Sequence, residues 1–254
     1  MQKRVQEDKQ SLRQSETFWH DHTRLLTLAL PMILANITTP LLGLVDTAVL
    51  GHMSAPAMLA GAAVGALILT QIYWVCGFLR MSSTGLSAQA RGHKDATLSS
   101  AKVLWQTLAV ASILGLGLLI LQAPILTAGL ALASPSDAVA VHLTEYYQVR
   151  VWGAPAAMLN LALIGYLVGQ QKTRTVMIIQ IIGNLVNAGL DITFVYVLSM
   201  SVAGVALASF IAEYSMAFMA MYVALKQVRG ITPQASWFNR AARKILMKLN
   251  TDML

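Results

Sequence analysis

Asp46 is the only ionisable residue in the apolar run 25–50. About 20 apolar residues are enough for a helix to cross a bilayer, so this carboxylate is expected inside the membrane. An ionisable side chain there costs about 2.5–3.5 kcal/mol on insertion scales and is usually functional. Its chemistry would be proton exchange or cation binding. The structural alternative is a carboxylate that caps the outer helix end beside Gly51.

A second group of polar residues, Asn184, Asn187 and Asp191, is spaced three and four residues apart. This spacing puts all three side chains on one face of a helix. Amide and carboxylate oxygens are suitable ligands for a hard cation such as Na⁺. We therefore interpret Asn187 and Asp191 as a cation site. Hydrogen bonding between helices is the alternative, and it explains Asn184 equally well.

The composition indicates a membrane protein and argues against several other classes. The 254 residues are 56% hydrophobic and 11% charged, whereas soluble domains carry about 25% charged residues. The net charge of +7 is scattered through short loops, which argues against nucleic-acid binding. A single cysteine excludes an intramolecular disulfide. The sequence contains no GxxxxGK[ST], HExxH or GxSxG motif, so neither an enzyme nor a cofactor is predicted.

Six long apolar runs position these residues, and they predict an all-α membrane protein with six transmembrane helices. The runs are 25–50, 59–82, 103–125, 143–169, 175–198 and 203–225. We divide the chain into a polar N-terminal segment, 1–24, a six-helix lobe, 25–225, and a C-terminal segment, 226–254. The residues 126–142 are read as a connection between the third and fourth helices.

The basic residues predict the orientation of these helices. Sixteen of the eighteen Lys and Arg residues lie on the side of the N-terminus, and the opposite loops contain none. By the positive-inside rule, both termini are cytoplasmic. In the C-terminal segment, Trp237, Phe238 and later apolar residues recur at helical spacing with basic residues between them. This pattern predicts an amphipathic helix that lies on the cytoplasmic membrane surface or links to another membrane unit.

Arg150 and Glu213 are two further ionisable residues inside predicted spans, in the fourth and sixth runs. Counted at 1.5 Å per residue, they fall with Asp46 and Asp191 in the outer half of the bilayer. A shared water-filled cavity would explain four such groups. Arg150 is expected to neutralise one of the three acids.

Five stretches carry a resemblance to the multidrug and toxic compound extrusion (MATE) transporters. They are 31–36 (PMILAN), 44–47 (LVDT) with Gly51, 78–90 (FLRMSSTGLSAQA), 183–194 (GNLVNAGLDITF) and 204–209 (GVALAS). The third stretch is similar to the DinF (DNA-damage-inducible protein F) branch of that family. The resemblance covers the chain from about Arg24 to Leu254.

The resemblance implies an antiporter in the bacterial inner membrane that exports cationic or amphipathic compounds in exchange for H⁺ or Na⁺. The family's essential Asp in helix 1 matches Asp46, and its other ion-site residues match Asn187, Asp191, Tyr146 and Ser209. The last position is Thr in the family and Ser here. Asn184, Arg150 and Glu213 are secondary candidates, and Na⁺ at Asn187 and Asp191 is the one metal ion considered.

The resemblance also implies a fold of twelve helices in two lobes, of which this chain corresponds to the N-terminal lobe. Two arrangements follow: a partial product that lacks the C-terminal lobe, or a homodimer of half-transporters. The functional rivals are a non-transporting assembly subunit or scaffold and an ion channel, for which no ring of acids or re-entrant loop is found. The exported compound and the choice between H⁺ and Na⁺ stay open.

Overall fold

The computed structural model describes residues 29–30, 33–34, 47–49, 51, 55–228 and 230–238, and all regular structure in these residues is helical. The α-helices are α2 (Pro56–Val75), α3 (Phe78–Arg91), α4 (Ala96–Ile120), α5 (Gln122–Ala133), α6 (Asp137–Arg150), α7 (Ala154–Gly169), α8 (Thr173–Ile192) and α9 (Val202–Gln227). Three short elements complete the list: the 3₁₀ turns η1 (Val151–Gly153) and η3 (Ala235–Phe238) and the π-helical turn η2 (Thr193–Val197).

Among the described residues, five helical segments are long and apolar enough to span a membrane, and they confirm the predicted fold class. They are Pro56–Arg91, Ala96–Ile120, Asp137–Gly169, Thr173–Val197 and Val202–Gln227. Each corresponds to one of the last five apolar runs. The first run, 25–50, lies mostly outside the described residues, and so does the N-terminal segment 1–24.

Two of these candidate spans consist of two α-helices each. The span Pro56–Arg91 bends at Cys76 and Gly77, between α2 and α3. The span Asp137–Gly169 passes through η1, between α6 and α7, where Pro155 stands in the first turn of α7. Proline lacks an N–H group, so it is favoured at the start of a helix and disfavoured within one. The apolar pattern of the sequence does not reveal either break.

The predicted connection 126–142 is wrong in part, because α5 occupies Gln122–Ala133. Leu, Ala and Ile favour a helix at these positions, and α5 is too short to span a bilayer. It ends at Ser134, whose φ of 43° is left-handed, just before Pro135. The requirement of about 20 apolar residues per span therefore predicts α4 but not α5.

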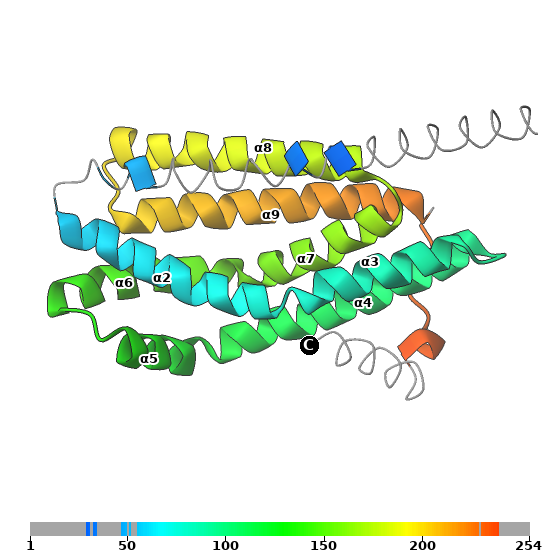
Figure 1. Ribbon diagram of the computed structural model, residues 1–254, viewed down its shortest axis with the longest axis horizontal. Coiled ribbons are helices and arrows are strands. Elements are labelled where there is room, and N and C mark those ends of the chain that lie inside the picture. Colours follow the sequence, from blue (N-terminus) through cyan, green and yellow to red (C-terminus); the bar gives the residue numbers. More distant parts are fainter. Residues whose placement is uncertain are drawn as a thin grey trace, which may run out of the picture.

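The helix α7 lies at the centre of the bundle and packs against α3, α4 and α9, while α2 packs against α6 and α8 against α9 (Figure 1). Small residues allow α3 to approach α7 closely. A Cβ atom at Gly165 would stand 2.4 Å from the carbonyl oxygen of Arg80, and one at Gly169 2.5 Å from that of Thr84. Gly61 and Gly65 likewise allow close contact with α6, and Gly115 allows it with α7.

The segment after α9 turns back onto α4. The indole N–H of Trp105 donates to the carbonyl of Ile231 over 2.8 Å, and the Gln106 amide donates to the carbonyl of Trp237 over 2.6 Å. Trp237 is only 7% exposed and packs in one buried cluster with Leu104 and Val228. The side chain of Trp237 therefore packs against the helix bundle. The rest of the predicted amphipathic helix, 239–254, lies outside the described residues.

Candidate functional site

The buried face of α8 carries the polar residues that the sequence singles out. Gly183, Asn187 and Asp191 recur every fourth residue and are all buried. At Gly183 the absent side chain admits Met216 of α9, because a Cβ atom there would lie 2.2 Å from Met216 Cγ. This close approach brings the polar face of α8 against α9.

Asn187 and Ser209 meet across this helix interface. The Asn187 side-chain amide donates to the Ser209 hydroxyl over 3.4 Å, and both side chains are buried. Asp191 lies one turn from Asn187 on the same face and is fully buried. An amide oxygen, a hydroxyl and a carboxylate are thus gathered within about one helical turn. Asn184 lies beside this face, half-buried.

Tyr146 is buried on α6, close to α2 and α9. A Cβ atom at Gly65 of α2 would lie 2.9 Å from Tyr146 Cδ1, so the glycine makes room for the ring. Tyr146 shares a buried cluster with Val205 and Ala206 of α9, which lie about one helical turn before Ser209. The described part of the chain therefore holds Asn187 and Ser209 in contact and Tyr146 in the adjoining cluster.

Asp46 lies outside the described residues. Val49, three residues later, is described and belongs to the same buried cluster as Tyr146.

Arg150 forms its ion pair with Glu213, one of the three acids that the sequence offered. The pair is bidentate: Nη1 donates to Oε2 over 2.8 Å, and Nη2 donates to Oε1 over 2.5 Å. The two side chains are 13% and 15% exposed. Asn160 of α7 donates to the backbone carbonyl of Glu213 over 2.9 Å. Sequence analysis did not single out Asn160, because a lone Asn in an apolar run has no distinctive spacing.

No cluster of three or more His, Cys, Asp or Glu side chains is found in the part of the chain that the structure describes. The donor set at Asn187, Asp191 and Ser209 is instead one carboxylate with neutral oxygens. Such a set suits a monovalent cation or a proton.

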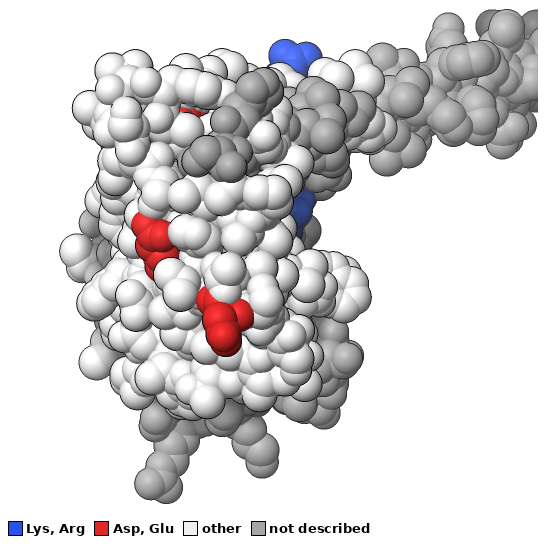
Figure 2. Space-filling model, turned by 90° about the vertical axis from the view of Figure 1, so that its left-hand side faces the viewer, with Lys and Arg blue, Asp and Glu red and all other residues white. Residues whose placement is uncertain are grey.

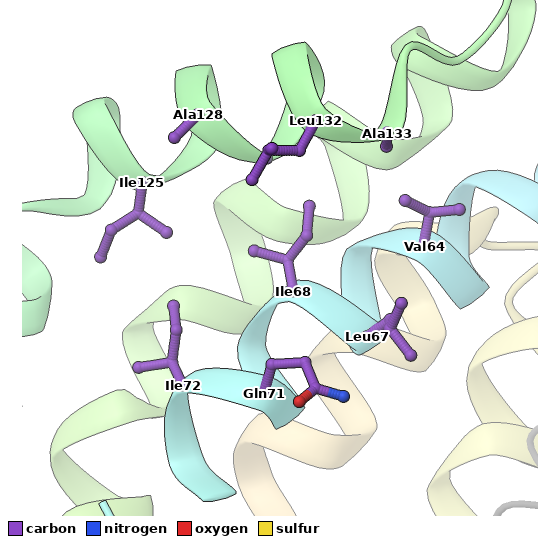
Figure 3. Close-up of a pocket in the computed structure, with 10 residues that line it drawn as sticks. Val64, Leu67, Ile68, Gln71, Ile72, Ile125, Ala128, Leu132 and Ala133 are labelled. Atoms are coloured by element: carbon purple, nitrogen blue, oxygen red, sulfur yellow. The ribbon is translucent and has the colours of Figure 1, made fainter. Parts of the chain in front are cut away.

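An apolar cavity of about 470 Å³ lies apart from these residues, between α2 and α5 (Figure 3). Ile68 and Ile72 line it from α2, and Ile125 and Leu132 line it from α5. Gln71 is the one polar side chain among its lining residues. Sequence analysis missed this cavity because it depends on α5.

Comparison with known proteins matches these features to one family. The MatE family model matches residues 31–193. The DNA damage-inducible protein F of Escherichia coli strain K12 is 41% identical over 246 residues, which are 94% of this chain and 51% of that protein. The probable multidrug resistance protein NorM of Shewanella oneidensis is 30% identical over 236 residues, 89% of this chain and 50% of that protein.

Solved structures agree on the fold. A crystal structure of MATE in the straight conformation has a TM-score of 0.75 at 22% identity and covers 90% of this chain and 51% of that one. A MOP superfamily transporter from Pyrococcus furiosus has a TM-score of 0.73 at 20% identity, over 89% and 51%. The chain thus spans about half the length of the relatives that it matches. The family match and the identity to the Escherichia coli protein together show that this chain belongs to the MatE family, the multidrug and toxic compound extrusion transporters.

Proposed function

We propose that this chain forms the N-terminal lobe of an efflux antiporter, which exports cationic or amphipathic compounds in exchange for H⁺ or Na⁺. The observation that carries the proposal is the contact between Asn187 and Ser209, one turn from the buried Asp191. Buried carboxylates and amides in a membrane span commonly mark ion pathways. The related multidrug resistance proteins support the export of drugs.

In this proposal Asp46 exchanges the proton, or contributes its carboxylate to Na⁺. Asp191, Asn187, Tyr146 and Ser209 complete the ion site. The buried position of Val49 in the cluster of Tyr146 supports a place for Asp46 near this site. Asn184, Arg150 and Glu213 would act indirectly, through helix packing.

The orientation belongs to the same proposal: both termini would be in the cytoplasm of a bacterium. α6 and α9 begin at one end of the bundle, at the left in Figure 1, after the connections 134–136 and 198–201. These connections contain no Lys or Arg. Figure 2 views this end and shows acidic side chains among a mostly uncharged surface. The loop 92–95 and Arg91, at the other end of α3, would face the cytoplasm.

Because the relatives are about twice as long, we propose that the chain works with a second six-helix lobe. A symmetric homodimer is the alternative. Even helix counts give both lobes the same orientation, so either arrangement is geometrically allowed.

The test is export of a fluorescent cationic dye from cells that express either this chain alone or the chain completed by a second lobe. We expect export only from the completed protein, driven by a pH or a Na⁺ gradient. Export by the chain alone would favour the homodimer. No export from either protein, with any dye, would favour the scaffold.

Asp46→Asn in the completed protein tests the proposed coupling residue. We expect it to abolish ion-driven export, whereas Asp137→Asn, which removes an exposed carboxylate at the start of α6, should leave export unchanged. Undiminished export by Asp46→Asn would contradict the role given to Asp46.

A further inference from the structure

The contacts around Arg150 and Glu213 join three parts of the bundle at one level. The bidentate ion pair links the end of α6 to α9. The next residue of α9, Tyr214, donates its hydroxyl proton to the carbonyl of Trp152 in η1 over 3.2 Å. Asn160 connects α7 to the backbone of Glu213. Hydrogen bonds therefore connect the span Asp137–Gly169 to α9 both before and after η1.

Gly153 makes this arrangement possible. A Cβ atom at this position would lie 2.7 Å from Arg150 Nη1 and 2.7 Å from Glu213 Oε2. Both side-chain ends would have to move, so any larger residue would disturb the ion pair without removing a charge.

A second tie joins α6 and α9 nearer the start of both helices, where the Ser201 hydroxyl donates to the Glu145 carboxylate. Tyr146 lies between Glu145 and Arg150 in sequence, and Ser209 lies between Ser201 and Glu213. Tyr146 and Ser209 each precede a member of the buried pair by four residues, which is about one helical turn. In sequence, Tyr146 and Ser209 thus each lie between a residue of the Glu145–Ser201 contact and a residue of the Arg150–Glu213 pair.

We propose that the Arg150–Glu213 pair is a positioning element, which fixes α6 and α9 in register and so holds Tyr146 and Ser209 at the ion site. The inference deepens the proposed function and rests on it for the role of these two residues. A guanidinium and a carboxylate in bidentate contact restrict both sliding and rotation of the two helices, because two parallel hydrogen bonds must be kept. An ordinary apolar interface would tolerate such movements more easily.

The register itself can be measured without transport. Spin labels at Val141→Cys on α6 and Phe218→Cys on α9, in a Cys76→Ser background of this chain in lipid nanodiscs, report one distance by double electron–electron resonance. Both positions are accessible, at 64% and 71% exposed. We expect Gly153→Ala and Arg150→Lys to shift the distance by about 1.5 Å, one residue along a helix, or to broaden it. Gly117→Ala, where a Cβ atom meets nothing within 4 Å, is the control and should change nothing.

The consequence for the site is measured in the completed protein, as the ion concentration that gives half-maximal dye export. Substituting a residue that orients ion ligands typically weakens ion affinity by about 10-fold or more. We therefore expect the half-maximal ion concentration to rise by this factor in both variants. Lysine keeps the charge of Arg150 but loses the two-pronged contact, so the two variants disturb the pair by different routes.

The two measurements separate the inference from the proposed function. An unchanged distance in both folded variants would overturn the positioning role, whether or not the protein exports. A changed distance with unchanged ion dependence would overturn the link to Tyr146 and Ser209. If the unmodified protein shows no ion-driven export, the proposed function and the link to the ion site both fail, and the distance measurement still decides the register.

Discussion

The Asn187 amide on α8 donates to the Ser209 hydroxyl on α9, and this contact joins two helices whose polar residues are 22 positions apart in sequence. Its geometry is long, at 3.4 Å, so it leaves both groups able to turn toward a bound cation. A polar contact at this place can serve either ion binding or helix association, and substitutions distinguish the two roles.

Ser209→Ala should weaken ion coupling, and Ser209→Thr should preserve it, because threonine retains the hydroxyl. Hydrogen bonds between membrane helices contribute about 0.6 kcal/mol on average, so the thermal stability of either variant should change little. The measurement is dye export as a function of Na⁺ concentration and pH. Wild-type ion dependence in Ser209→Ala would mean that the contact only holds the helices together.

The Arg150–Glu213 pair also makes a prediction about stability. Glu213→Leu alone leaves a buried guanidinium without its carboxylate, which should destabilise the fold by about 3–5 kcal/mol. The double variant Arg150→Met/Glu213→Leu should recover most of this loss, since apolar pairs often replace buried ion pairs without cost. Unfolding in detergent, followed by circular dichroism, measures both. Equal losses in the single and double variants would contradict this account.

The contact between α3 and α7 should be sensitive to one methyl group. At Gly165 a Cβ atom would stand 2.4 Å from a backbone oxygen, which cannot turn aside as a side chain can. Gly165→Ala should therefore cost about 1–3 kcal/mol. Gly117→Ala is the control in α4, with open space around the new methyl group, and should be neutral or slightly stabilising. The same unfolding assay compares them, and equal effects would show that the close approach is not maintained.

The apolar runs predicted the helices because the bilayer requires about 20 apolar residues per span. The spacing of Asn187 and Asp191 predicted that they share a face of α8, and both are buried there, whereas Asn184 lies beside that face. The partner of Arg150 could not be predicted in the same way. Arg150 pairs with Glu213 because of the way α6 packs against α9. This packing is a tertiary property that the local sequence pattern does not contain.

The contact of Trp237 with α4 could not be predicted for a related reason. Its amphipathic surroundings fit a membrane surface and a contact with another helix alike, and the sequence does not reveal that the Gln106 amide donates to the Trp237 carbonyl. α5 was not predicted because it is too short to be a membrane span, and without α5 the cavity that Ile125 and Leu132 line could not be predicted either.

Trp237→Ala should destabilise the protein by about 3–5 kcal/mol, the usual cost of removing a buried large side chain. The matched control is Trp74→Ala, because Trp74 is 81% exposed and its removal creates no cavity. The melting temperature of the purified chain in detergent compares the two variants. A membrane-surface position for Trp237 would instead give two variants of similar stability.

Labelling from one side of the membrane tests the orientation. Ser136 and His93 are both exposed, at opposite ends of the bundle, and each can be replaced by cysteine in a Cys76→Ser background. The loop of His93 carries Arg91 and Lys94, whereas the connection at Ser136 carries no basic residue. Basic loops are retained in the cytoplasm, so an impermeant maleimide added to intact spheroplasts should label Ser136→Cys and spare His93→Cys. Lysed spheroplasts supply the control, in which both should react. The reverse pattern would invert the lobe, and the proposed ion site would then open from the cytoplasmic half of the membrane.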